Sequence, residues 1–247
     1  MYVATWRAGK VSIRASVTVA KPLTGAKLRA AYVDCVPAMT FGLARFRDGA
    51  VVLGPFTLLR FGAPVVTRTS VEWPIEGGLL AGAPGGTWRI HAAGRHVDAT
   101  VTAFRPRLPR AVYTLTHLQV HELFTRLYLL RLHGRDEAVA SVPRDRRLRA
   151  ASIDLALCLA LARLTGSRRA GRRARRALAI AAIYHVACWS VWGRTLGGLG
   201  LRQRVVAVDG SRPTAQQALL RLAFVPVSWL TRRPLHDDVA QTQVVEG

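Results

Sequence analysis

The sequence predicts a protein of two parts that differ in fold class. Residues 1–143 are expected to form a soluble α+β domain, rich in strands and ending in a long amphipathic helix, and residues 144–247 an α-helical membrane domain with short hairpin spans. Short apolar runs between turn residues dominate the first part, two longer apolar runs occur in the second, and a polar segment containing Pro143 separates them. Short runs are typical of strands, and longer runs are typical of helices.

The chain is both basic and apolar. Its 36 Lys and Arg against 14 Asp and Glu give a net charge of +22, and 50% of its 247 residues are hydrophobic. A disordered basic tail would be far less apolar. The arginines also run through both parts and form no single stripe, so the charge does not indicate a nucleic-acid interface. The composition therefore favours a lipid bilayer as the partner and predicts no binding of nucleic acid.

The first part shows a series of strands before a helix. Between Ala50 and Arg105 apolar runs alternate with turn residues, and the pairs Gly77-Gly78 and Gly85-Gly86 suit turns with positive φ. From Ala111 to about Gly134 leucines recur at helical spacing, which predicts one amphipathic helix. A sheet followed by a long helix loosely resembles lipid-binding helix-grip folds of the START and polyketide-cyclase kind, in architecture alone. This supports an alternative: a wholly soluble lipid- or small-ligand-binding protein.

No motif predicts an enzyme, a cofactor or a metal site. His117 and His121 stand four residues apart with Glu122 beside the second, so one helical face could present two metal ligands. The order is HxxxHE, whereas zinc proteases have HExxH, and no third ligand is evident, which favours packed or surface histidines. There is no Walker A loop and no GxSxG elbow, and the three cysteines have no ligand spacing.

The second part contains two apolar runs, at about residues 150–166 and 177–192. As a helix, each would be about 24–26 Å long, at the short end of what crosses a bilayer core of about 30 Å. A soluble hairpin buried in a core is the alternative. A third stretch contains Arg221 and Pro226, and it fits a kinked interfacial or re-entrant helix better than a straight span.

Three motifs occur in order in this part. RLRAASID carries Arg147, Ala150 and Asp154; GRTLGGLGLRQRVVAVDG carries a Gly-x-Thr-x-Gly turn before a valine-rich strand; LHDDVAQTQVV closes the chain. Together they resemble the RDD family, named for an arginine and two aspartates, over about residues 144–245 and none of the first 140. The motif positions shared with the family include those of the turn, Gly193, Thr195 and Gly197, and those of the C-terminal segment, Arg221, His236 and Asp237. The family commonly has Lys directly after the turn, where this chain has Gly198.

The resemblance implies a polar cluster within the membrane domain. Arg147 and Asp154 are two helical turns apart and share one helix face. Because a carboxylate inside a bilayer costs about 2.5–3.5 kcal/mol on insertion scales, Asp154 is expected to pair with a basic side chain. We expect a structural cluster that joins both ends of the domain, with these members: Arg147, Asp154, Arg221, His236 and Asp237.

The function expected from this resemblance is that of a non-enzymatic integral membrane protein, either a scaffold or a component of ion or small-solute transport. Two short spans cannot enclose a pathway, so transport would require a homo-oligomer or a membrane partner protein. The apolar runs predict a multi-pass protein of the cell membrane. No apolar stretch of signal-peptide length follows the N-terminal charges, so both termini and the N-terminal domain are expected in the cytoplasm. The basic loop between the helices would then lie outside or at the interface.

Overall fold

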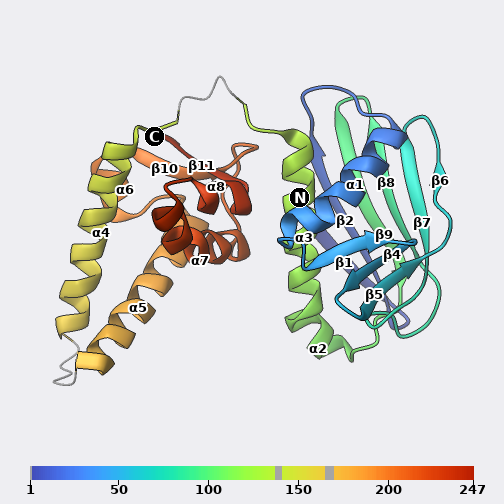
Figure 1. Ribbon diagram of the computed structural model, residues 1–247, viewed down its shortest axis with the longest axis horizontal. Helices are drawn as coiled ribbons and strands as arrows, with labels where there is room; N and C mark the ends of the chain where they lie inside the picture. The colour runs from blue at the N-terminus through green and yellow to red at the C-terminus, as the bar shows by residue number, and fades with distance from the viewer. Residues whose placement is uncertain (1, 137–140, 165–169) are drawn as a thin grey trace. The chain divides into compact units, whose positions relative to one another are not determined.

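A computed structural model describes residues 2–136, 141–164 and 170–247. The chain divides into two compact units, Met1–Gly134 and Arg135–Gly247 (Figure 1). The basic loop expected between the apolar helices falls partly on residues 165–169, which lie outside the described part. Ser141, placed by the sequence in the linker, bridges Val245 near the C-terminus.

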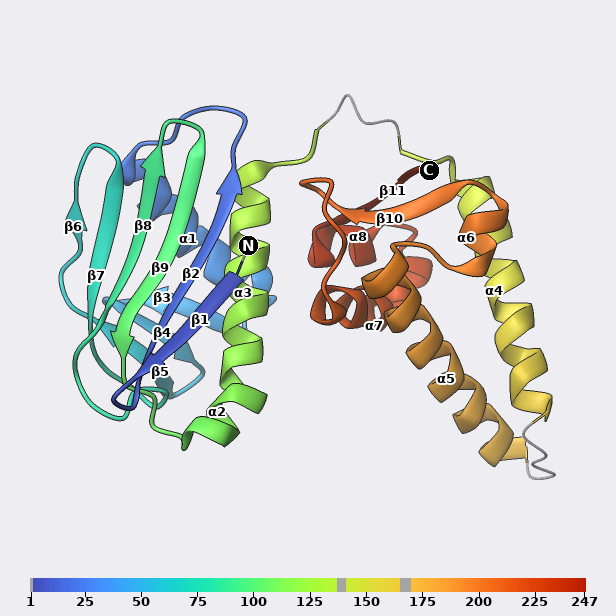
Figure 2. The ribbon, with the colours of Figure 1, turned by 180° about the vertical axis from the view of Figure 1, so that it is seen from behind.

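The N-terminal unit is an antiparallel sheet with helices on one face (Figures 1 and 2). The strand order is β1-β2-β9-β8-β7-β5-β4-β3, with β6 paired to β7. The strands are β1 Tyr2–Arg7, β2 Lys10–Thr18, β3 Ala44–Arg47, β4 Ala50–Leu53, β5 Phe56–Phe61, β6 Val65–Val66, β7 Ser70–Gly77, β8 Thr87–Ala93 and β9 His96–Phe104. The helices are α1 Gly25–Met39, α2 Arg110–Leu115 and α3 His117–His133.

Aromatic side chains fill the space between the sheet and its helices. Residues of β8 alternate, so that Trp88 faces the core while its neighbour Arg89 is exposed. Tyr32 of α1 lies between Trp73, Trp88 and Tyr128, with ring centroids 5.2, 5.6 and 5.7 Å away. The predicted sheet followed by helices is therefore confirmed, and its core consists of packed rings.

The single helix predicted from Ala111 to Gly134 is wrong in one respect, because it breaks into α2 and α3 at Thr116. The hydroxyl of Thr116 donates to the carbonyl of Val112 at 2.6 Å, and the backbone of Thr116 leaves the helical region at φ −120° and ψ −80°. Such local bonds compete with the helical hydrogen-bond pattern.

The C-terminal unit is mostly helical, with one two-stranded antiparallel sheet, β10-β11. Its elements are α4 Arg144–Leu164, α5 Ala170–Ala187, a π-helical turn η1 Cys188–Trp192, α6 Leu196–Gly200, β10 Gln203–Ala207, α7 Ala215–Thr231, α8 Leu235–Ala240 and β11 Thr242–Glu246. Helices α4 and α5 form a hairpin, and α7 packs against α5 and α8 (Figure 2).

The expected helices form, but their bounds differ from the prediction. Helix α4 begins at Arg144, directly after Pro143, and therefore starts before the apolar run expected at about residues 150–166. Pro226 lies inside α7. Within the described ranges, no helix combines the length and the apolar character that a bilayer crossing requires.

The core of the N-terminal unit generates a stability test. Leu28 of α1 is fully buried, whereas the side chain of Leu43 is 69% exposed. We expect Leu28→Ala to lower the free energy of unfolding of this unit by about 2–5 kcal/mol through a cavity. Leu43→Ala, the matched control, should change it by less than about 0.5 kcal/mol. Denaturant-dependent hydrogen exchange of β8 and β9 measures both, and equal losses would contradict the assigned core.

Candidate functional site

A buried carboxylate connects four elements of the C-terminal unit. Asp237 of α8 is 3% exposed. Its Oδ2 accepts a hydrogen bond from Arg147 of α4 at 3.0 Å, and its Oδ1 pairs with Nη1 of Arg221 of α7. Thr242 of β11 donates to the same Oδ1 at 3.1 Å and accepts from Arg221 at 2.7 Å. We call Arg147, Arg221, His236, Asp237 and Thr242 the Asp237 cluster.

Two further contacts fix the cluster in place. The guanidinium of Arg221 lies over the ring of Trp189 in η1, 5.1 Å from the centroid, which is within cation–π range. The backbone N–H of His236 donates to the hydroxyl of Ser228 at 2.8 Å, and Nδ1 of its ring lies 2.8 Å from the same oxygen. Ser228 is one helical turn from the end of α7, so these bonds attach α8 to that end.

The charges of the cluster follow from its burial. Burial lowers the pKa of His236 to about 4, and the nearby charge of Arg221 adds to this effect. Burial alone would raise the pKa of Asp237, but the guanidiniums of Arg221 and Arg147 outweigh it and hold that pKa below its ordinary value. At neutral pH the cluster therefore contains two cations, one carboxylate and a neutral imidazole.

Asp154 of α4 belongs to a second set of contacts. Its Oδ1 accepts from the hydroxyl of Tyr184 at 2.7 Å and from the backbone N–H of Gly197 at 2.9 Å. The same hydroxyl accepts from the backbone N–H of Leu196 at 2.8 Å. Thr195 caps the start of α6 by accepting from Gly198 at 3.1 Å. Asp154 and Tyr184 thus hold the first turn of α6 against the α4–α5 hairpin.

The backbone geometry of this turn requires glycine at two positions. Gly193 ends η1 with φ 71°, a left-handed conformation that glycine adopts without strain. Gly197 packs directly on the backbone carbonyl of Ala150, where a methyl group would collide. The close approach of α6 to α4 therefore requires glycine at this position.

The structure brings Arg147, Arg221, His236 and Asp237 together, but the expectation that Asp154 joins them is wrong. Among the described residues Asp154 forms no ion pair; a tyrosine hydroxyl and a backbone N–H supply its hydrogen bonds. Sequence reasoning missed Tyr184. The available signal was a hydroxyl inside an apolar helix, which usually has a partner when buried.

His117 and His121, the two histidines weighed as metal ligands, lie on α3. Nδ1 of His121 lies 3.3 Å from the hydroxyl of Tyr2, and burial lowers the pKa of His121 to about 4. No group of three metal-ligating side chains occurs in the described ranges.

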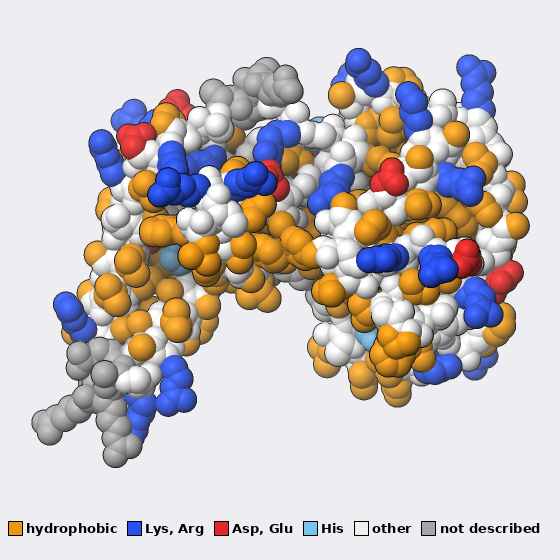
Figure 3. Space-filling view, in the orientation of Figure 1, with side chains coloured by type: hydrophobic (Ala, Val, Ile, Leu, Met, Phe, Trp, Pro, Cys, Tyr) orange, Lys and Arg blue, Asp and Glu red, His pale blue; other side chains and the backbone are white. Residues whose placement is uncertain are grey.

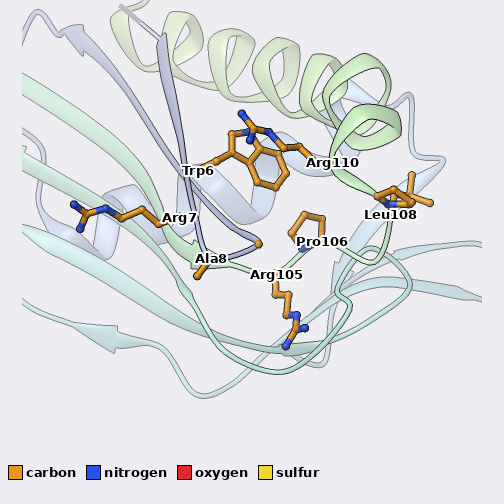
Figure 4. A pocket seen from close by; sticks show the side chains of 9 residues that line it. Trp6, Arg7, Ala8, Arg105, Pro106, Leu108 and Arg110 are labelled. Carbon is orange, nitrogen blue, oxygen red and sulfur yellow. The ribbon is translucent and has the colours of Figure 1, made fainter.

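A shallow pocket of about 310 Å³ lies beside Trp6 in the N-terminal unit. Arg110 stacks on Trp6, with 5.3 Å between its guanidinium carbon and the ring centroid, while Arg7 and Arg105 point in different directions (Figure 4). These arginines therefore do not converge on one ligand.

Comparison with known proteins supports the resemblance for the C-terminal unit. The model of the RDD family matches residues 176–237, from α5 to Asp237. No curated protein and no solved structure matched the chain.

The contact between Gly197 and α4 can be tested by two alanine substitutions in one helix. In Gly197→Ala the new methyl group would collide with the carbonyl of Ala150 and lie 3.1 Å from the carboxyl carbon of Asp154. We expect a loss of about 1–3 kcal/mol in the stability of the C-terminal unit. Gly200→Ala is the control, because nothing lies within 4 Å of its added methyl group. The thermal unfolding midpoints of both variants measure the loss. A wild-type midpoint in Gly197→Ala would disprove the close packing.

The pKa of His236 leads to a pH dependence. Its value in the folded unit, about 4, lies below the ordinary value of 6.5. The unfolded chain therefore binds a proton that the folded unit does not, and the free energy of unfolding falls as the pH drops from 6.5 to 4. Asp237 extends this loss below its ordinary pKa of 3.8.

We expect His236→Asn to remove the fall in the free energy of unfolding between pH 6.5 and 4. Urea unfolding at a series of pH values, followed by hydrogen exchange in α7 and α8, measures how steeply the free energy of unfolding changes with pH. His96→Asn, in the other unit, should leave it unchanged. A wild-type slope in His236→Asn would show that another group titrates.

Proposed function

Because the C-terminal unit contains an RDD-family domain, we propose that this unit attaches the protein to a lipid bilayer and serves there as a non-enzymatic scaffold. The α4–α5 hairpin and α7 embed their apolar faces in the lipid. The N-terminal unit is the part that remains in water, on the cytoplasmic side. The observation that carries the proposal is the large apolar surface that these helices leave exposed.

Helix α4 buries one narrow stripe. The buried residues are spaced four apart: Ala150, Asp154, Cys158 and Ala162. Leu157 is half-buried, and six other large apolar side chains of the helix are exposed: Leu148, Ile153, Leu155, Leu159, Leu161 and Leu164. A helix in a water-soluble domain normally buries a broader apolar stripe, and exposed patches of this kind mark protein or membrane contacts.

The neighbouring helices show the same feature. Leu178 and Ile183 of α5 are each 71% exposed, and Trp229 and Leu230 at the end of α7 are 64% and 85% exposed. In the C-terminal unit of Figure 3, hydrophobic side chains form a band between two ends where Arg side chains gather. Apolar bands with basic and tryptophan edges are typical of segments at a membrane interface.

The length of the apolar band favours insertion into the interface over a complete crossing. On α4 it runs from Ala150 to Ala162, between Arg149 and Arg163. These 13 residues correspond to about 20 Å of helix, less than the bilayer core of about 30 Å. A hairpin that lies in one leaflet satisfies both observations.

A scaffold role fits the polar groups better than transport does. Asp154 accepts two hydrogen bonds that hold α6, and Asp237 joins α4, α7 and β11. Both aspartates therefore have structural roles. We accordingly propose the bilayer as the primary partner, with further copies or a membrane protein as secondary partners.

Vesicle flotation of the purified full chain tests the proposal. Leu155 and Ile183 are exposed, so the double variant Leu155→Glu/Ile183→Glu should keep its fold. A charged side chain at the centre of an inserted helix costs about 2.5–3.5 kcal/mol on insertion scales, so we expect the bound fraction to fall at least tenfold. Leu43→Glu, at a leucine of the N-terminal unit that is 69% exposed, is the control and should float like the wild type. Undiminished flotation of the double variant, or a wild type that does not float, would refute membrane attachment through these helices.

A further inference from the structure

The Asp237 cluster has an excess of positive charge. Arg147 and Arg221 share the single carboxylate of Asp237, and His236 contributes no charge at neutral pH. Two other acids of the C-terminal unit pair with other arginines: Asp238 with Arg135 at 3.1 Å and Glu246 with Arg146 at 2.5 Å. One positive charge of the cluster therefore has no counter-ion among the described residues.

The cluster also has two donors without acceptors. Nε of Arg147 and Nε of Arg221 are buried and form no hydrogen bond with any described residue. The whole side chain of Arg221 is 6% exposed. A buried donor that loses water without gaining a partner destabilises the fold, and an unbalanced buried charge does so more strongly. A second anion at this cluster would balance the excess charge.

Access to the cluster is from the side of Arg147. Its side chain is 25% exposed, whereas that of Asp237 is 4% exposed. Arg147 also lies one turn before Ala150, where the apolar band of α4 begins. A guanidinium at this level is where lipid phosphates lie, and its planar fork suits an oxyanion with two adjacent oxygens.

We propose that the Asp237 cluster binds a phosphate group, with Arg147 as the contacting residue and Arg221 as the buried charge behind it. The phosphate comes either from a lipid headgroup or from free inorganic phosphate. This inference goes beyond membrane attachment, because a headgroup site gives the unit selectivity among anions and does not follow from an apolar surface.

Thermal unfolding of the full chain in a neutral detergent tests the site with inorganic phosphate. Ionic strength is kept constant with chloride, since phosphate salts stabilise many proteins without a site. The expected result is a saturable rise of a few degrees in the unfolding midpoint of the C-terminal unit at millimolar phosphate. The proposal is overturned if neither inorganic phosphate nor a short-chain phosphatidic acid produces a saturable rise in this midpoint.

Variants of α4 assign the effect to Arg147. Arg147→Gln leaves Asp237 paired one to one with Arg221, so the unit should fold, and we expect its phosphate affinity to fall at least tenfold. Arg147→Lys keeps the charge but loses the fork, should weaken binding less, and replaces Arg147→Gln if that variant does not fold. Arg144→Gln, at an exposed arginine in the first turn of the same helix, is the control. A wild-type phosphate response in the Arg147 variants, or a loss equally large in Arg144→Gln, would overturn the assignment.

A second arm distinguishes the two sources of phosphate. Dihexanoyl phosphatidic acid, below its micellar concentration, is compared with dihexanoylglycerol, which lacks the phosphate. Tighter binding of the phosphatidic acid than of inorganic phosphate identifies a headgroup site, and equal binding identifies a free-anion site. Because this assay contains no bilayer, its outcome is independent of flotation. A chain that floats but responds to neither phosphate retains the proposed function and loses this inference.

Discussion

The ion pairs of Asp237 join α4, α7 and α8 of the C-terminal unit at one buried carboxylate. Arg147 comes from α4 and lies 90 residues away in sequence, Arg221 comes from α7, and Thr242 opens β11. A buried ion pair of this kind adds little net stability compared with apolar packing, but removing Asp237 would leave two guanidiniums without their shared carboxylate. The cluster therefore defines which arrangement of the helices is allowed more than it increases their stability.

The two buried aspartates of the C-terminal unit have different kinds of partners. Asp237 uses charged partners at the basic edge of the apolar band, whereas Asp154 uses a tyrosine hydroxyl and a backbone N–H beside the start of α6. Uncharged donors suit Asp154, because it lies among the exposed apolar side chains of α4. An arginine at this place would itself have to be paired or hydrated. The bilayer proposal and the placement of these residues are thus physically consistent.

Periodicity predicts the strands after Ala50 and the long helices, and the resemblance to the RDD family implies the clustering of Arg147, Arg221 and Asp237. They do not predict the partner of Asp154, because a single tyrosine in an apolar run has no spacing that points to a carboxyl group. The break at Thr116 is also missed, since a hydroxyl that bonds back to Val112 leaves the hydrophobic pattern unchanged. The part of the sheet before β4 receives no prediction, because its strands are recognised only from their pairing, of β2 with β9 and of β3 with β4.

The π-helical turn η1 determines how this domain tolerates changes in length. The hydrogen bonds of a π turn enclose one residue more than those of an α-helix, and here the turn lies between α5 and the glycine turn that leads to α6. Deleting one residue from Cys188–Trp192 would restore α-helical bonding and leave the rotation of the following residues about the helix axis nearly unchanged, because the residue removed is the extra one. Deleting one residue within α5 would instead rotate everything beyond it by about 100° about the helix axis, so that Trp189 would lose its place under Arg221 and Gly197 its place on α4. Homologous domains that keep these two contacts should therefore differ in length by one residue at this turn and not within α5.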